Sequence, residues 1–547
     1  MKHLIYIAIA GIITLSACKK DFLERPPLNQ TSEDTFWKSE NDVYLAVNSI
    51  YSQLPGDGII YDDGSADNAH SQYPWESSAN SISSGIVNSS LNAGWSFVNI
   101  RRQNYFLENV DKAVMDETLK ARYTAEVRFV RAFTYLGLMQ KFGDVPLLQH
   151  TLNIDSANVE RSPRAEVLKF ILDELTDVAN ILPDTYTGGK GNEKGRITKG
   201  AALALKARTH LYEGQWQEAV TESQKVMGLG YSLFKVSAEA AIDAQDDYNK
   251  WITFDNELDE KRFRLGLRSY EGLFHKKNES NSEVILDRQY IPQTDAQLIN
   301  TYLLPGTIGG WSSVTPTQAL VNAYESYKTG APITPPTDAQ RGTWYKDKNA
   351  SFYNEYKNRD PRFYASILFE TAPWNAIEDG YQFKWTQGAS NMSQTGYNFR
   401  KLVDPVAQRV PEDNHANIIL LRYAEVLLTY AEAKNELSGP DATIYDALDL
   451  IRERSGMPLV NRANYANQTE LRELIRRERR VELALEGQRY MDIRRWKIAP
   501  EVMTTIKDVR NEIAQERIWT DKLYLMPVPQ DQIDLSEGLL SQNTGYN

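Results

Sequence analysis

The sequence has very little cysteine and histidine, two residue types from which many covalent and metal-based sites are built. Among 547 residues it has one cysteine, Cys18, and six histidines, which are scattered without a His-x3-His or Cys-x2-Cys spacing. A single cysteine excludes a disulfide framework within the chain. The missing ligand spacings argue against a zinc-type catalytic centre. The sequence therefore predicts no metal and no other cofactor.

Sequence motifs of the common enzyme classes are also absent. The chain has no Gly-x-Ser-x-Gly elbow, no Walker loop and no Gly-x-Gly-x-x-Gly fingerprint. Glycosidases need only a pair of carboxylates, but with 73 acidic residues some pair always exists, and nothing in the sequence singles one out. We therefore expect a protein that is not an enzyme, with a glycan-degrading enzyme as the weaker alternative.

The chain has no excess of positive charge. Its formal net charge is −12 and its pI is near 5.3, whereas a nucleic-acid partner would require a basic surface to neutralise phosphates. With 41% hydrophobic and 24% charged residues the chain is long and apolar enough to bury a large core. We expect a globular protein that does not bind nucleic acid.

Only one apolar run stands out, and it is too short to span a membrane. It extends from Leu4 to Leu15, within the roughly 7 to 15 residues of a signal-peptide core and below the ~20 residues of a spanning helix. The order Leu15-Ser16-Ala17-Cys18 that follows resembles a bacterial lipobox. This resemblance implies that residues 1–17 are removed and that Cys18, acylated with diacylglycerol and palmitate, becomes a lipid anchor. Several acyl chains hold a protein stably at a bilayer, and residues 18–36 would form a tether.

Much of the remaining sequence has the spacing of amphipathic helices. Apolar residues recur at intervals of three and four, which is typical of a helix with one buried face, over residues 39–54, 95–114, 123–142, 162–182, 197–214, 421–437, 442–455 and 471–486. The turn at Gly214, with small residues before it and Trp216 after it, resembles a tetratricopeptide repeat. Stacked helix hairpins of this kind predict a right-handed superhelical scaffold.

Two segments lack this helical spacing. Residues 61–94 are rich in Asp, Asn, Ser and Gly and are much longer than the usual connection of ~4 to 6 residues. Residues 236–400 have mixed short patterns and hold most of the remaining tryptophans. We expect both segments to be irregular and loop-rich, and to bind the ligand.

Ordered blocks of sequence in the second half resemble the SusD/RagB family. The blocks include residues 419–428, 476–484 and 487–496, and the similarity extends to residues 126–132, 142–147, 195–202, 358–362 and 525–546. Together they cover essentially the whole chain after Cys18. The chain is therefore identified as a member of this family of nutrient-capturing surface lipoproteins.

The resemblance implies a fold, a location and a partner. The fold class would be mainly α, a tetratricopeptide-like scaffold over about residues 37–235 and 401–500 with irregular ligand-binding segments at 61–94 and 236–400, all within a single SusD-like domain of residues 37–547. The protein would be lipid-anchored in the outer membrane and exposed on the cell surface. It would form a lid over a SusC-like TonB-dependent transporter and deliver oligosaccharides to it.

The family blocks themselves are interpreted as structural. In residues 471–486, Glu473 lies four positions before Arg477 and Arg479 three before Glu482, spacings that place opposite charges side by side on a helix. We expect a solvated or inter-helix ion network there. An arginine patch for phosphate is the less favoured alternative, because glutamates alternate with the arginines.

Candidate ligand-binding residues are exposed aromatic rings beside short polar groups, because rings stack on the C–H face of a sugar while amides bond to its hydroxyls. Trp75 and Trp311 are predicted as stacking platforms, Tyr73 as a third ring and Asn68 as a hydroxyl partner. For each of them packing in the core is an equal alternative. Trp95, Trp216 and Trp496 lie on helical patterns and are predicted to be core residues.

Two further possibilities stay open at this point. Long polar loops rich in rings can also hold a peptide, so capture of oligopeptides is the second hypothesis. Asp62 and Asp63 could contribute to a calcium site, although two adjacent aspartates are a poor signal for one.

Overall fold

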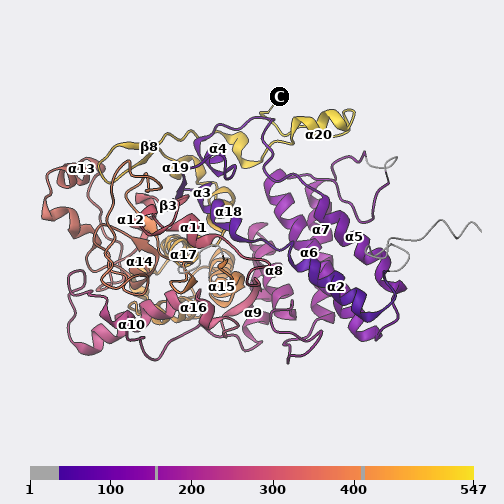
Figure 1. Ribbon diagram of the computed structural model, residues 1–547, viewed down its shortest axis with the longest axis horizontal. Coiled ribbons are helices and arrows are strands. Elements are labelled where there is room, and N and C mark those ends of the chain that lie inside the picture. The colour runs from indigo at the N-terminus through magenta and orange to yellow at the C-terminus, as the bar shows by residue number, and fades with distance from the viewer. Residues whose placement is uncertain (1–35, 154–157, 408–412, 547) are drawn as a thin grey trace, which may run out of the picture.

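The computed structural model describes residues 36–153, 158–407 and 413–546 (Figure 1). The predicted signal peptide at 1–17, the lipid anchor Cys18 and all of the predicted tether except Phe36 lie outside these residues. Within the described ranges, no helix combines the length and the apolar character of a membrane-spanning segment.

The first half of the chain forms a stack of antiparallel helices, as the apolar spacing predicted. They are α2 (Glu40–Tyr51), α5 (Val98–Asn109), α6 (Glu117–Phe142), α7 (Arg164–Ile181), α8 (Lys199–Tyr212) and α9 (Trp216–Met227). Several begin where a side chain satisfies free backbone amides: the side chains of Ser39, Asp116 and Thr198 accept from Asp42, Leu119 and Ala201. The cap at Asp116 starts α6 earlier than residue 123, where the periodicity placed it.

The stack continues after a long insertion. Helix α9 packs against α15 (Tyr423–Ser438), which packs in turn against α16 (Ala442–Arg454) and α17 (Gln468–Glu482). In Figure 1 the helices follow one another from α5 and α7 on the right, through α8 and α9, to α15 and α16. The mainly helical fold with a hairpin scaffold is therefore confirmed.

The two segments predicted to be irregular contain many short elements. Residues 61–94 hold most of α3 (Ile60–Gly64), all of β1 (Ala69–Ser71) and all of α4 (Ala79–Ser84), so this segment consists of short elements joined by loops. The insertion holds α10 (Glu257–Gly272), α11 (Ile299–Leu303), α12 (Gln318–Ala323), α13 (Asp338–Lys346) and α14 (Pro361–Ser366). The C-terminal part adds α18 (Arg489–Arg495), α19 (Ala499–Val502) and α20 (Gln530–Leu535). Short 3-10 helices lie between them: η3 (Asp57–Ile59), η4 (Val110–Lys112), η6 (Asp243–Gln245), η7 (Lys276–Asn278), η8 (Gly306–Ile308), η9 (Ala350–Tyr356), η12 (Arg462–Tyr465) and η13 (Asp521–Tyr524).

The strands of the described residues form four small antiparallel pairs. They are β1 with β3 (Val314–Pro316), β2 (Val284–Arg288) with β6 (Ile418–Arg422), β4 (Ile367–Leu368) with β5 (Asn398–Phe399), and β7 (Ile506–Lys507) with β8 (Ile513–Gln515). Three of the pairs join segments that are distant in the sequence. They fasten the irregular segments to each other and to the scaffold.

The charged face of α17 is buried rather than solvated. Glu482 is wholly buried and accepts from Arg362 at 2.9 Å and Arg422 at 2.7 Å, and it also pairs with Arg454. Arg477 pairs with Glu325, outside the helix. An inter-helix ion network was predicted correctly. The predicted ion pairs within one helix were not the ones that form here, because spacing along a helix indicates only local neighbours. Removing one member of such a buried pair leaves the other charge uncompensated.

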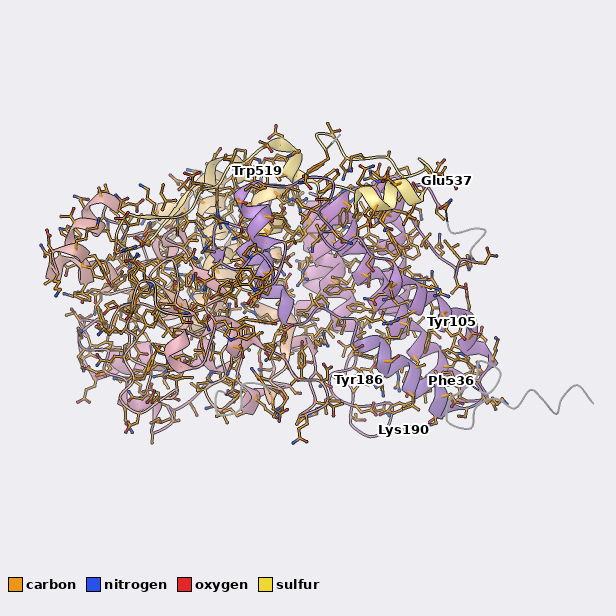
Figure 2. All side chains as sticks on the ribbon, turned by 45° about the horizontal axis from the view of Figure 1, so that its top comes forward. Phe36, Tyr105, Tyr186, Lys190, Trp519 and Glu537 are labelled. Carbon is orange, nitrogen blue, oxygen red and sulfur yellow. The ribbon has the colours of Figure 1, made fainter. Side chains whose placement is uncertain are left out.

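At the amino-terminal end of the described chain, α2 and α5 leave an open apolar groove between them. It is lined by Phe36, Leu45, Val98 and Tyr105 among others, and Figure 2 shows Phe36 and Tyr105 at the same end of the molecule. Leu45 and Val98 are exposed there.

Candidate functional site

The structure brings together the two aromatic segments that the sequence placed far apart. Strand β1 pairs antiparallel with β3, with Ser71 opposite Val314. The pairing continues beyond the strands, because the backbone N–H of Gln72 donates to the backbone carbonyl of Ser313 at 3.0 Å. The Gln72 side chain donates to the carbonyl of Trp311, 239 positions along the chain, at 3.1 Å. In Figure 1 the labels of β3, α3, α4 and α11 lie in the upper half of the larger, left-hand part of the molecule.

Three rings at this junction form what we call the aromatic ridge: Tyr73, Trp75 and Trp311. Trp75 is 78% exposed and Trp311 41% exposed. The rings of Tyr73 and Trp75 are 5.0 Å apart at an angle of 31°, so they form one continuous tilted surface. Tyr302, which the sequence analysis missed, extends the ridge, with its ring 6.0 Å from that of Trp311. An exposed ring without a folding role is a ready surface for stacking.

The other tryptophans differ from these two in exposure. Trp95 is buried, as predicted, whereas Trp216 and Trp496 are only half-buried, so their assignment to the core was too strong. The Nε1–H of Trp496 donates to Glu432 at 2.7 Å. This polar partner explains why the ring lies at the edge of the core. Among the tryptophans of the described residues, Trp75 and Trp311 are the ones that present a ring to solvent.

The backbone at Trp311 is held in an unusual conformation. Gly309 has φ of 84°, and a Cβ on Gly310 would lie 1.9 Å from the carbonyl oxygen of Leu304. Ser312 adopts φ of 51°, in the left-handed region that is costly for a residue with a Cβ. Its hydroxyl donates to the Asn391 carbonyl at 2.8 Å and accepts from Asn398 at 2.9 Å. The glycines next to Trp311 are thus required by a tight turn, which fixes the ring in place.

A polar groove lies along the Tyr73 side of the ridge. It has a volume of about 360 Å³, and its polar lining includes four amide side chains, Gln72, Gln387, Asn391 and Gln394, together with the paired Asp508 and Arg510. The Tyr73 hydroxyl donates to the Asn391 Oδ1 at 3.1 Å. Amides both donate and accept, which suits the hydroxyl groups of a neutral sugar. Of these groups the sequence offered a signal only for Gln72, which directly precedes Tyr73.

Asn68 does not belong to the exposed site. Its side chain is wholly buried, where its amide donates to Asp63 Oδ1 at 3.0 Å and its oxygen accepts from Arg480 at 2.8 Å. The prediction of Asn68 as a hydroxyl partner was therefore wrong. The residue instead fixes the segment that carries Tyr73 and Trp75 to α17.

Beside Asn68, a buried aspartate anchors the same segment. Asp67 accepts from Arg489 through both oxygens, at 2.7 and 2.9 Å, and pairs with Arg480 at 2.8 Å. Burial raises the pKa of Asp67, but the neighbouring Arg480 and Arg489 outweigh it and hold the pKa well below its usual range. The Arg517 guanidinium donates to the carbonyls of Ala66 and Ala69 at 2.8 and 2.9 Å. We call Asp67, Arg480, Arg489 and Arg517 the arginine clamp.

The histidine of strand β1, which leads to the ridge, is not suited to catalysis. His70 is buried, and burial together with Arg517 lowers its pKa to about 4. It is therefore neutral at pH 7, and its Nε2 lies 3.0 Å from Gln394 Oε1.

The two adjacent aspartates do not converge on a metal. Asp63 points into the protein, where its carboxylate accepts hydrogen bonds from the Asn68 side chain and the Gly487 backbone N–H. Asp62 instead faces a separate cavity. In residues 36–153, 158–407 and 413–546 no three His, Cys, Asp or Glu side chains could jointly hold a metal ion.

Comparison with known proteins places this architecture in a family. The family model described as the SusD family matches residues 270–546, and one described as starch-binding associating with outer membrane matches residues 21–211. A solved SusD-like protein from Bacteroides fragilis is 31% identical with a TM-score of 0.80, over 95% of this chain and all of that one. A SusD-like carbohydrate-binding protein from the same species is 26% identical with a TM-score of 0.75, covering 92% and 99%.

A curated relative supports the same assignment. The starch-binding protein SusD of Bacteroides thetaiotaomicron is 26% identical over 84% of this chain and 79% of its own length. The chain belongs to the SusD family.

Proposed function

We propose that this protein binds oligosaccharides at the aromatic ridge without degrading them. The observation that carries the proposal is that the β1–β3 pair brings together two distant segments, each of which carries a solvent-facing ring, Trp75 and Trp311. Such a ridge, with an amide-lined groove beside it, matches the two kinds of contact that sugars make. Relatives described as starch-binding and carbohydrate-binding support the ligand class.

The chemistry of the ridge supports binding rather than hydrolysis. The groove beside the ridge presents four amides, its Asp508 is paired with Arg510, and the nearby Asp67 is neutralised by arginines in the clamp. A general acid needs a carboxyl whose pKa lies near the working pH, whereas the pKa of Asp67 is held low. Incubating the tightest-binding glycan with the protein and measuring reducing ends tests this point, and turnover would refute it.

The experiment that tests the site is titration of neutral oligosaccharides against ridge variants. The panel would contain malto-, laminari-, cello- and xylo-oligosaccharides, measured by isothermal calorimetry. Trp75→Ala and Trp311→Ala are expected to weaken binding, and Leu535→Ala, an exposed residue on α20, serves as the matched control. Unchanged affinity in both tryptophan variants would remove the proposed ridge.

We further propose that binding takes place at the cell surface and serves import. The lipobox-like order that ends in Cys18 supports a lipid anchor, and the family relationship supports delivery to a SusC-like TonB-dependent transporter. Cys18→Ala should abolish palmitate labelling and release the protein from the membrane fraction. Affinity purification from detergent extracts should recover a large barrel protein, and its absence would contradict the proposed partner.

A further inference from the structure

A second cavity, separate from the amide-lined groove, adjoins the ridge at Tyr302. It has a volume of about 400 Å³ and is walled by three tyrosines: Tyr61 of α3, Tyr302 of α11 and Tyr490 of α18. The Tyr61 and Tyr302 rings are 5.8 Å apart, close to edge-on. Since Tyr302 is also in contact with Trp311, the cavity adjoins the ridge directly.

The same cavity is lined by an excess of carboxylates. Asp57, Asp62 and Glu76 contribute to its wall, against one basic residue, Lys141. The Lys141 Nζ is 4.0 Å from Asp62 Oδ1, at the limit of an ion pair. Glu76 accepts from the Tyr61 hydroxyl at 2.7 Å, so a tyrosine and a carboxylate are locked together at the wall. One lysine cannot balance three acids, and the cavity is therefore electronegative.

Two polar groups in this cavity lack adequate partners within the protein. Tyr490 is 2% exposed, and its hydroxyl has no hydrogen-bond partner among the described residues. A buried hydroxyl without a partner costs free energy and is uncommon in native proteins. Burial raises the pKa of Asp62 even though Lys141 and Arg494 act to lower it, so its negative charge is incompletely compensated. Both groups would gain from a hydrogen-bonding cation.

The combination of rings and carboxylates selects one kind of ligand group. Tyrosine faces attract an ammonium through their ring quadrupole, and carboxylates bind it through charge-assisted hydrogen bonds. An anionic sugar is disfavoured, because a sulfate or uronate would be repelled by Asp57, Asp62 and Glu76. A metal ion is disfavoured as well, since the acids do not form a three-residue group that could hold one.

We infer that this cavity is a subsite for the ammonium group of an amino sugar, next to the pyranose units that stack on the aromatic ridge. The inference rests on the proposed function, because the ridge holds the neighbouring sugar rings. Asp62 and Glu76 accept from the ammonium, and Tyr61 and Tyr302 face it. The ligand would then be an oligosaccharide that carries at least one free amine.

A matched pair of ligands tests the charge directly. A glucosamine hexasaccharide and its fully N-acetylated counterpart have the same backbone, but acetylation removes the positive charge. The wild-type protein is expected to bind the free-amine form about tenfold more tightly, the contribution of one hydrogen bond to a charged group. Equal affinities, or no binding of either sugar, would overturn the inference.

Variants locate the effect within the cavity. Asp62→Asn removes the partly exposed carboxylate and should bring the two affinities together, with Asp347→Asn on an exposed site at the end of α13 as the control. Glu76→Gln should act in the same direction. A preference for the amine that survives both substitutions would refute the assignment, and stronger binding of an oligolysine peptide than of either sugar would reassign the cavity to a peptide.

Failure of this inference is separable from failure of the proposed function. The neutral oligosaccharide panel is bound at the ridge and depends on Trp75, not on Asp62. If neutral sugars still bind in a Trp75-dependent way but the preference for the amine is missing, only the amino-sugar subsite is refuted. If substitution of Trp75 and of Trp311 changes the affinity for no sugar, the proposed ridge is refuted as well.

Discussion

Replacing Trp75 by alanine is the most direct test of the aromatic ridge, because the ring is 78% exposed and has little role in folding. Aromatic side chains bury ~150 to 250 Å² when fully covered. A sugar ring covers only one face, or about 80 Å² of the indole, and at ~25 cal/mol per Å² this contributes about 2 kcal/mol. The dissociation constant is therefore expected to rise ~30-fold.

The same substitution should leave folding almost unchanged. Trp75 lies in a turn closed by the Glu76 N–H and the Tyr73 carbonyl, but its φ is not positive, so alanine can adopt the same backbone. Surface substitutions of this kind alter the free energy of unfolding by about 0.5 kcal/mol or less. The assay is isothermal calorimetry with the tightest neutral oligosaccharide, together with urea unfolding of each variant. The expected result is a large loss of affinity at constant stability for Trp75→Ala and no change in either quantity for Leu535→Ala. A loss of less than threefold for Trp75→Ala would refute the reasoning, and so would an equal loss for the control.

Three further predictions concern buried ion pairs and close packing within the fold. Asp67→Ala leaves the arginine clamp unpaired and should destabilise the protein by about 3 to 5 kcal/mol, as measured by urea unfolding, while the isosteric Asp67→Asn should lose less. The pKa of Glu271 is lowered to about 2, because Arg400 and Arg268 outweigh the effect of burial. The stability that this carboxylate contributes is complete above pH ~4.5, where the unfolded carboxyl ionises, and should be lost as the pH falls toward 2. Glu271→Gln should reduce this pH dependence of the free energy of unfolding. Gly266→Ala should destabilise α10 by about 1 to 3 kcal/mol, since its Cβ would lie 2.4 Å from the Ser455 carbonyl; an alanine variant as stable as wild type in thermal unfolding would contradict the close approach.

The helical scaffold was largely predictable because its signals are local. Apolar spacing and a capping residue act within a few positions, and they located α2, α7, α8, α15 and α16 to within a few residues. The start of α6 was missed because its first turn carries few apolar residues to reveal the period. The short strands were not predicted, since two- or three-residue strands are stabilised by partners far away in the sequence.

The candidate site was predictable in its rings but not in its polar groups. Trp75 and Trp311 stood out because each lies in a polar, glycine-rich or proline-containing segment, outside any helical pattern. Asn68 has the same kind of neighbours, yet it is buried against Arg480, more than four hundred positions later. Residue type and local context cannot distinguish an amide that binds a ligand from one that binds an arginine of the same chain.

The sequence by itself determined the helical repeats and the resemblance to the SusD family, because both depend on local order or on residue types. Only the tertiary structure decided which rings share a surface, since the β1–β3 pair joins Gln72 to Trp311 across 239 positions. It also decided that the α17 glutamates are buried among arginines and that Asp62 and Asp63 face different ways. Contacts of this kind follow from packing over long distances in the chain, which local spacing does not encode.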